Sequence, residues 1–221
     1  MPVSIKPSTA YARCFPMYAK TTVNIRAAPG IKSKVTGRFY WNDKVRVIKR
    51  VNKNWYMLSY KGKNRYICSK YLRRKPYKYK TYIPPVPGVF KSYEDADCIT
   101  GSTEYAQGRI KKEYHLDYQS GVWMAGNRYC IAVGSHYTTG IGIKIDLVLS
   151  HNEKKHVLEC ITADSKADKD TVDRHRIHTD GSVTEFIVDT DTLPRKAKIM
   201  GDVSYAGKKF KGRIIKIKVY R

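Results

Sequence analysis

Short apolar segments separated by turn residues recur along the chain, and their lengths and spacing are typical of β-strands. In residues 44–49, Val45 and Val47 alternate with lysine and arginine, which is the pattern of a strand with one buried and one exposed face. Residues 213–220 alternate in the same way. The pattern predicts a mainly all-β protein.

The predicted strands fall into two groups. The first group predicts a small SH3-like β-barrel, with strands at residues 23–26, 35–39, 44–48, 55–58 and 65–68. The second group predicts a β-barrel of about six strands, with strands that include residues 128–134, 140–149, 159–164, 183–189 and 213–220.

The segment between the two groups, residues 73–91, is rich in proline, tyrosine and basic residues. Because proline fixes φ and lacks the backbone N–H group, this segment is predicted to be a stiff, extended and unpaired linker. The predicted organisation is therefore an N-terminal arm (1–20), a small barrel domain (21–72), a linker (73–91) and a second barrel domain (92–221).

Charge is distributed unevenly along the chain. Residues 1–92 contain 22 lysine and arginine residues and one acid, a net charge of +21, whereas residues 93–221 contain 21 basic and 18 acidic residues, a net charge of +3. This asymmetry predicts two units with different roles, of which the first is attracted to polyanions.

The sequence also bears on where the protein acts. It has no apolar run of about 18 residues, which a membrane-spanning helix needs, and no apolar leader segment at its N-terminus. We therefore expect synthesis in the cytoplasm, no membrane partner, and action at another place after cell lysis or as part of a particle.

Residues 21–72 carry several motifs in a fixed order. They are Val-Asn-Ile-Arg (23–26) followed by Pro-Gly, Asp-Lys-Val-Arg-Val (43–47), Asn-Trp-Tyr (54–56) and Tyr-Ile-Cys-Ser-Lys-Tyr-Leu (66–72). These motifs resemble the bacterial SH3 (SH3b) domain, although Arg65 stands where the family usually has glycine. The resemblance implies a module that binds peptidoglycan and has no catalytic activity. The aromatic and basic residues assigned to wall binding are Trp41, Trp55, Tyr56, Tyr66 and Arg26.

Candidate chemistry lies in residues 129–191, which contain most of the carboxylates of the chain. The segment contains no serine-hydrolase elbow, phosphate loop or zinc-protease motif. Asp173, His175, His178 and Asp180 have the residue types of a zinc site, but two arginine residues lie among them and their charge opposes metal binding. We therefore expect an exposed, charge-balanced loop, with no metal and no other cofactor.

Two acids in this segment occupy strand positions. Asp164 follows Glu-Cys-Ile-Thr-Ala (159–163) at the exposed end of a predicted strand, where a side chain can point into a cleft. Glu185 lies inside Val-Thr-Glu-Phe-Ile-Val (183–188), where removal from water would raise the pKa of a carboxyl group, as a general acid requires. The alternation nevertheless places Glu185 opposite Phe186, and by pattern alone this is a solvent-facing position.

The second domain contains four segments in a definite order: Ala-Val-Gly-Ser (132–135), Gly-Ile-Gly-Ile-Lys-Ile (140–145), Ile-Thr-Ala-Asp (161–164) and Val-Thr-Glu-Phe-Ile-Val (183–188). They resemble the 3D domain, the double-psi β-barrel of MltA-type lytic transglycosylases and related wall-remodelling proteins. Of the three signature aspartates of that family, Asp164 fits the second, Glu185 stands at the third, catalytic position, and Gly134 replaces the first. The resemblance implies that Glu185 protonates the glycosidic oxygen and then accepts the proton of the sugar's own 6-hydroxyl group. Asp164 would hold the substrate or tune that acid.

These features predict a protein directed at the bacterial cell wall, with peptidoglycan and anionic wall polymers as partners. The sequence leaves open whether the second domain is an enzyme. In the leading hypothesis the first domain binds the wall and the second cleaves glycan strands, as a lysin of the lytic transglycosylase type from a phage or prophage. A second hypothesis is a non-enzymatic tail, virion or wall-attachment protein, with other phage particle proteins as partners.

A third hypothesis is nucleic-acid binding through the basic arm and the lysine–tyrosine alternation of the linker. The basic residues are scattered over both faces of the first group of strands rather than gathered in a stripe. This scatter argues against a nucleic-acid partner.

Overall fold

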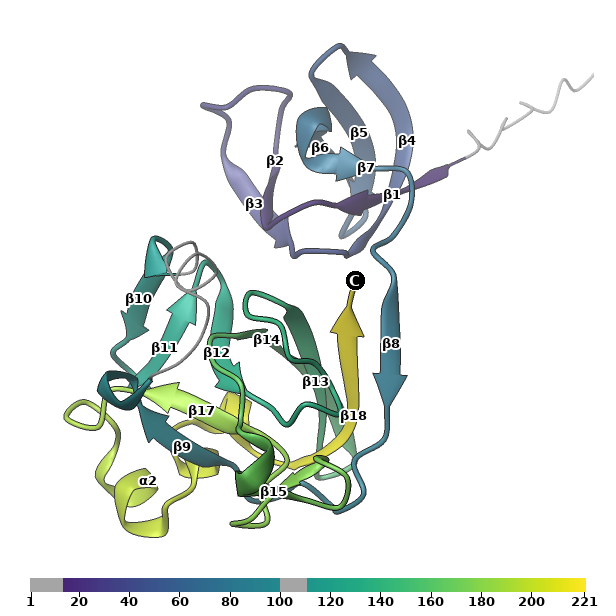
Figure 1. The fold of residues 1–221 in the computed structure, drawn as a ribbon. Helices are drawn as coiled ribbons and strands as arrows, with labels where there is room; N and C mark the ends of the chain where they lie inside the picture. The colour runs from purple at the N-terminus through teal and green to yellow at the C-terminus, as the bar shows by residue number, and fades with distance from the viewer. Residues whose placement is uncertain (1–13, 100–110) are drawn as a thin grey trace, which may run out of the picture. The chain divides into compact units, whose positions relative to one another are not determined.

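The computed structural model describes residues 14–99 and 111–221, and the chain divides into two compact units, residues 1–77 and 78–221. Each unit is built mainly of β-strands (Figure 1), which confirms the predicted all-β class. No helix in these two ranges has the length and apolar composition needed to cross a membrane.

The first unit contains an antiparallel sheet of seven strands in the order β3-β2-β6-β5-β4-β1-β7. The strands are β1 (Phe15–Ala19), β2 (Val23–Arg26), β3 (Val35–Phe39), β4 (Lys44–Asn52), β5 (Trp55–Tyr60), β6 (Lys63–Cys68) and β7 (Leu72–Arg73), with a 3₁₀ turn, η1 (Ser69–Tyr71), before β7. The predicted alternation is confirmed in β4, where Val45 and Val47 are buried while Lys44, Arg46 and Lys49 are exposed. The two valines contact a core that also contains Met17, Ala19, Val23, Leu58, Ile67 and Leu72.

The structure corrects the predicted N-terminal arm. Residues 15–19 form β1, which pairs with β4 on one edge and with β7 on the other, and Met17 and Ala19 are buried. The strand is short and contains Pro16, so its alternation is too brief to be recognised in the sequence. The rest of the predicted arm, residues 1–13, lies outside the described residues.

The second unit is organised around a nine-stranded sheet with the order β10-β11-β17-β12-β14-β13-β18-β8, in which β9 also pairs with β17. Its strands are β8 (Tyr79–Tyr82), β9 (Ser92–Asp95), β10 (Tyr114–Asp117), β11 (Val122–Ala125), β12 (Arg128–Ala132), β13 (Lys144–His151), β14 (Lys154–Thr162), β17 (Glu185–Val188) and β18 (Arg213–Tyr220). Most pairings are antiparallel, but β12 pairs in parallel with β14, and β17 pairs in parallel with β9.

Shorter elements fill the loops of the second unit. They are the paired strands β15 (Thr171–Val172) and β16 (Ile177–His178), the helix α2 (Arg195–Met200), and the 3₁₀ turns η2 (Ala96–Cys98), η3 (Asp168–Asp170), η4 (Val203–Tyr205) and η5 (Lys208–Phe210). The loop that contains β15, β16 and η3 precedes β17 in the chain.

The structure also corrects the predicted linker and the predicted strand number. Within residues 73–91, Tyr79–Tyr82 form β8 and pair with β18. Pro76 and Pro84 lie outside β8, so the N–H groups of the strand remain free to pair. The expected six strands are too few, because β8 to β11 come from segments whose sequence pattern is mixed.

Arg128 joins three strands of the second unit from inside the sheet. The residue lies on β12 and is 2% exposed, and its Nη1 donates to the carbonyl oxygens of Ile145 (3.2 Å) and Cys160 (2.9 Å). The same nitrogen forms an ion pair with Asp146 at 3.0 Å, and Tyr220 on β18 donates to the other carboxylate oxygen of Asp146 at 2.5 Å. A charged side chain that is this deeply buried is tolerated only because its partners compensate it.

Candidate functional site

Glu185 is the first residue of β17, a strand that is enclosed on both faces. The strand pairs with β9, β11 and β12. Phe186 and Val188 contact the large apolar core, and Ile187 contacts a smaller apolar cluster on the other face. Glu185 is therefore only 5% exposed, and the interpretation of a solvent-facing residue is wrong. The sequence pattern did not predict this burial, because alternation along one strand does not show whether apolar residues cover its second face.

Asp164 and Lys166 follow the end of β14 and lie in the same neighbourhood. Lys166 donates from Nζ to Oε2 of Glu185 at 2.8 Å. Asp164 is buried rather than exposed as predicted; burial raises the pKa of its carboxyl group, and the Ser165 N–H group and the Lys166 charge oppose the rise. The charges of Asp164 and Glu185 both act on Glu94. The two predicted acids, Asp164 and Glu185, therefore both interact with Lys166 and Glu94.

Glu94 is a member of this group that the sequence did not reveal. It lies on β9, whose parallel register places Ser92 opposite Glu185 and Glu94 opposite Ile187. Because alternate residues of paired strands share a face, Glu94 and Glu185 lie on the same side of the sheet. Burial and then the negative charge of Glu185 raise the pKa of Glu94 to about 7, and a hydrogen bond to Glu185 and the charge of Asp164 add to the rise. We refer to Glu94, Asp164, Lys166 and Glu185 as the carboxylate site.

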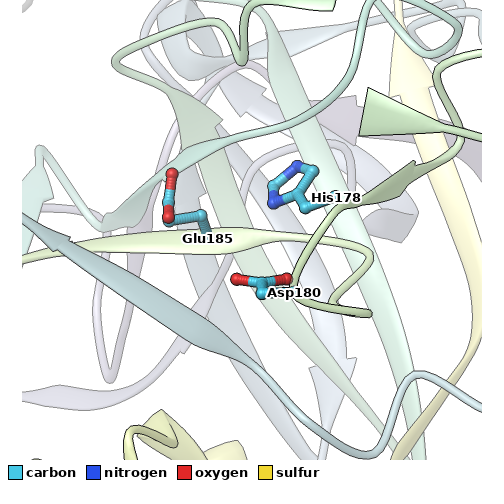
Figure 2. A group of neighbouring side chains, drawn as sticks. All are labelled: His178, Asp180 and Glu185. Carbon is cyan, nitrogen blue, oxygen red and sulfur yellow. The ribbon is translucent and has the colours of Figure 1, made fainter. Parts of the chain in front are cut away.

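His178 and Asp180 lie beside Glu185 (Figure 2), and the potential metal-ligating atoms of the three side chains are all within 4.8 Å of one another. His178 is buried, and its Nδ1 is 3.1 Å from Oγ of Ser182. Burial, followed by the charge of Lys166, lowers the pKa of His178 to about 4, so the imidazole is neutral near pH 7. A neutral imidazole and two carboxylates fit the preferences of zinc. However, Lys166 already supplies Glu185 with a cation, and this opposes the binding of a second one.

The predicted histidine–aspartate loop therefore divides into two parts. Asp173 pairs with Arg176 at 2.6 Å, and the side chain of His175 is 42% exposed, as expected of a charge-balanced loop. His178 is buried instead, and its immediate partners are the residues next to β17. The prediction of an exposed loop is wrong for this histidine, because β16 turns its side chain inward.

Two aromatic side chains lie close to the carboxylate site. Tyr114 on β10 and Trp123 on β11 have ring centroids 6.0 Å apart, and both pack against the small apolar cluster that contains Ile187. Burial raises the pKa of the Tyr114 phenol, and the charge of Asp164 contributes to this rise. Aromatic faces next to acid–base groups are a combination that suits a sugar ligand, which presents both C–H surfaces and hydroxyl groups.

Gly134, where the predicted resemblance would place an aspartate, has no room for a side chain. A Cβ atom at this position would lie 2.2 Å from the carbonyl oxygen of His175. That carbonyl belongs to a run of three residues with positive φ, Asp173, Arg174 and His175, with φ of 52°, 57° and 62°. Non-glycine residues adopt this region at an energetic cost, so the turn has a fixed and unusual shape. The close approach of this turn explains why only glycine fits at position 134.

We expect Gly134→Ala to lower the free energy of unfolding of the second unit by about 1–3 kcal/mol, because the backbone of one segment must move to admit the methyl group. Thermal unfolding and amide hydrogen exchange of the second unit measure this effect. Gly207→Ala is the control, because a Cβ atom there would meet the ring of Phe210 at an ordinary 3.7 Å. Equal stability of the two variants would show that the contact at Gly134 is not rigid.

In the first unit, two of the residues predicted to bind the wall line the same pocket. Arg26 and Trp55 border a pocket of about 460 Å³, and Arg26 is held in place because its Nη1 donates to the carbonyl oxygen of Ser33 at 2.7 Å. Tyr71 and Lys70 on η1 also line it, with the Lys70 ammonium 4.7 Å from the ring centroid of Tyr71. The other lining residues are Thr22, Val23, Asn24, Ile31, Asn54 and Cys68. The sequence analysis missed Tyr71 and Lys70, although they belong to the closing motif of residues 66–72.

The other three predicted wall-binding residues lie elsewhere. Trp41 is buried and stacks on Tyr77 with 4.4 Å between ring centroids. Tyr56 neighbours Trp55 on β5 but projects to the opposite face, where it lines a second pocket with Phe15 and two arginine residues. Tyr66 is half-buried on β6 and is paired across the sheet with Arg26. The five predicted residues therefore do not form a single surface.

Residues 21–73 match the family described as Bacterial SH3 domain. This confirms the resemblance predicted for residues 21–72. A comparison with curated proteins gives no match. Among solved structures, the chain is similar to NlpC2 from Trichomonas vaginalis, with 13% sequence identity over 80% of this chain and 68% of that chain and a TM-score of 0.25. A TM-score this low carries no argument about fold or function. The resemblance of the second unit to the double-psi barrel of the 3D domain stays a prediction.

Proposed function

We propose that this protein acts on the bacterial cell wall, where the bacterial SH3 unit binds peptidoglycan and the second unit cleaves the glycan strand. The observation that carries the proposal is that two buried acids, Asp164 and Glu185, and one cation, Lys166, lie in one neighbourhood. The charge of Asp164 also acts on the phenol of Tyr114. Burial raises the pKa of the Asp164 carboxyl group, and a carboxyl group with a raised pKa is what acid–base cleavage of a glycosidic bond needs.

The proposed binding site is the pocket lined by Arg26, Trp55, Lys70 and Tyr71. Its cations suit the carboxylates of peptide stems, and its aromatic rings offer apolar contact area. The net charge of +21 in residues 1–92 would concentrate the protein on anionic wall polymers. This long-range attraction is screened by salt, whereas contacts inside the pocket are screened less.

We expect Tyr71→Ala to weaken binding to purified sacculi by about tenfold, because an exposed aromatic side chain that lines a pocket is a typical binding hot spot. Tyr71 is 37% exposed, so its removal leaves the core of the unit intact. Tyr40→Ala is the matched control, since Tyr40 is a 49% exposed tyrosine of the same unit that does not line the pocket. Pelleting assays at a fixed salt concentration measure both. Equal losses in the two variants would remove the pocket from the proposal.

The proposed reaction is that of a lytic transglycosylase. A carboxylic acid of the site protonates the glycosidic oxygen, and the 6-hydroxyl group of the same sugar attacks the anomeric carbon and gives up its proton. This route closes an anhydro ring without consuming water, and the enclosed position of Glu185 on β17 supports it. The test is to incubate the full-length protein with purified sacculi and to analyse the soluble fraction by mass spectrometry. Release of anhydro-ended fragments supports the proposal, and intact sacculi contradict it.

A second candidate is a binding-only protein, such as a tail or wall-attachment component of a phage or prophage. The ion pair between Lys166 and Glu185 favours it, because a buried carboxylate that is paired with a cation also serves a purely structural role. Tight pelleting with sacculi without release of any soluble fragment would support this candidate. Under either candidate the site of action would be the wall, and release of fragments would favour the cleaving protein over the binding-only one.

A further inference from the structure

We infer that Glu94 is the proton donor of the carboxylate site and that Glu185 is its charged partner. The inference rests on the proposed glycan cleavage and deepens it, because it assigns the reacting proton to a residue on a different strand. The family resemblance pointed instead to Glu185, at the position of the catalytic aspartate.

The first argument is the placement of the two carboxyl groups. Glu94 and Glu185 project from neighbouring parallel strands on one face of the sheet, and the negative charge of Glu185 acts on Glu94. Two ionised carboxylates that share one partly buried site repel each other, so the ionisation of both is unfavourable. The pair therefore holds one proton.

The second argument concerns which of the two carboxyl groups carries that proton. Nζ of Lys166 is 2.8 Å from Oε2 of Glu185, which stabilises the ionised form of Glu185 directly. Around Glu94 the effects of burial, of Glu185 and of Asp164 all favour the protonated form, and only the charge of Lys166 opposes them. The resulting pKa of Glu94 is about 7, which is in the range where a group can both donate and regain a proton near neutral pH.

The reaction step then balances without any other reactant. The proton of Glu94 moves to the glycosidic oxygen, and the bond between that oxygen and the anomeric carbon breaks with its electron pair left on the oxygen. The 6-hydroxyl oxygen forms the new bond to the anomeric carbon, and its proton returns to the carboxylate of Glu94. Throughout the step Glu185 stays negative and stabilises the positive charge that develops on the sugar ring.

Two measurements on the full-length protein test the assignment. The first is a ¹³C NMR titration of the glutamate carboxyl carbons, which needs no substrate. We expect one carboxyl resonance to titrate near pH 7, to disappear in Glu94→Gln, and to titrate at still higher pH in Lys166→Met, because the lysine charge lowers the pKa of Glu94. The second is the rate of fragment release from sacculi as a function of pH. We expect it to fall as the pH rises through about 7, where Glu94 loses its proton.

Glu94→Gln is expected to lower the release rate by about 10²–10⁴-fold, the usual contribution of a general acid. Glu153→Gln is the matched control, because Glu153 is exposed in the turn between β13 and β14, and it should leave the rate unchanged. An ordinary pKa for Glu94 in the NMR titration overturns the inference whether or not sacculi are cleaved. Full activity of Glu94→Gln overturns it while the proposed function stands. If the wild-type protein releases nothing although the resonance titrates near pH 7, the proposed function fails and the acid role fails with it.

Discussion

Glu185→Gln is expected to lower the rate at which soluble glycan fragments leave purified sacculi by about 10²-fold or more, the scale of loss when an acid–base group is removed. Glutamine has nearly the same shape but no charge. The variant would therefore lack the negative charge that stabilises the oxocarbenium-like transition state. It would also lack the negative charge that raises the pKa of Glu94. Lys166 would be left without its 2.8 Å partner at a position that is only partly exposed.

We expect the Glu185→Gln variant to keep its binding to the wall while it loses cleavage. The bacterial SH3 match ends at Arg73, and Glu185 belongs to the other compact unit, so pelleting of Glu185→Gln with sacculi should equal that of the wild-type protein. Glu153→Gln again serves as the control for the chemical change itself. Undiminished release by Glu185→Gln would remove Glu185 from the reacting groups and assign the cleavage to other side chains.

The second large effect is expected for stability. Arg128→Ala should lower the free energy of unfolding of the second unit by about 3–5 kcal/mol, the range found when one partner of a buried ion pair is removed. The reason is that Asp146 would remain buried without its cation, and the carbonyl oxygens of Ile145 and Cys160 would each lose a charged donor. Hydrogen exchange of the β13 and β14 amides reports on this unit in the intact chain, without assuming that both units unfold together.

Arg213→Ala provides the comparison for Arg128→Ala. Arg213 begins β18 and its side chain is exposed, so the same substitution there should change the free energy of unfolding by no more than about 0.5 kcal/mol. A loss of less than about 1 kcal/mol for Arg128→Ala would mean that the sheet tolerates an unpaired Asp146, in conflict with the cost of buried charge.

The features that the sequence predicted are those determined by neighbouring residues. Alternation in β4 is local, because Val45 and Val47 face one core while the basic residues between them face water. The bacterial SH3 motifs are local in the same sense, since each one is a strand with its turn. For this reason the class of the fold and the central strands of the first barrel follow from the pattern alone, whereas β1 does not.

The burial of Glu185 could not be predicted in this way. It depends on a second apolar cluster, around Ile187, and on the parallel pairing of β17 with β9, a strand from a distant part of the chain. Glu94 was hidden for the same reason, because nothing in residues 92–95 indicates which strand they join. The need for glycine at position 134 was hidden as well, because it depends on the carbonyl oxygen of His175, which is distant in the sequence.

Lys166 is another residue whose role depends on the fold. Its ammonium group lies 2.8 Å from a carboxylate oxygen of Glu185, and its charge also acts on Glu94 from the loop after β14. The carboxylate site is therefore assembled from three separate parts of the chain, namely β9, β17 and the loop after β14.

The most direct test of the proposed reaction is the origin of the oxygen at the new sugar end. Purified sacculi are incubated with the full-length protein in water enriched in ¹⁸O, and the released fragments are analysed by mass spectrometry. Intramolecular attack by the 6-hydroxyl group predicts anhydro-ended fragments that contain no ¹⁸O. Fragments with ¹⁸O at a free reducing end, or the absence of any fragment, would contradict the proposed mechanism.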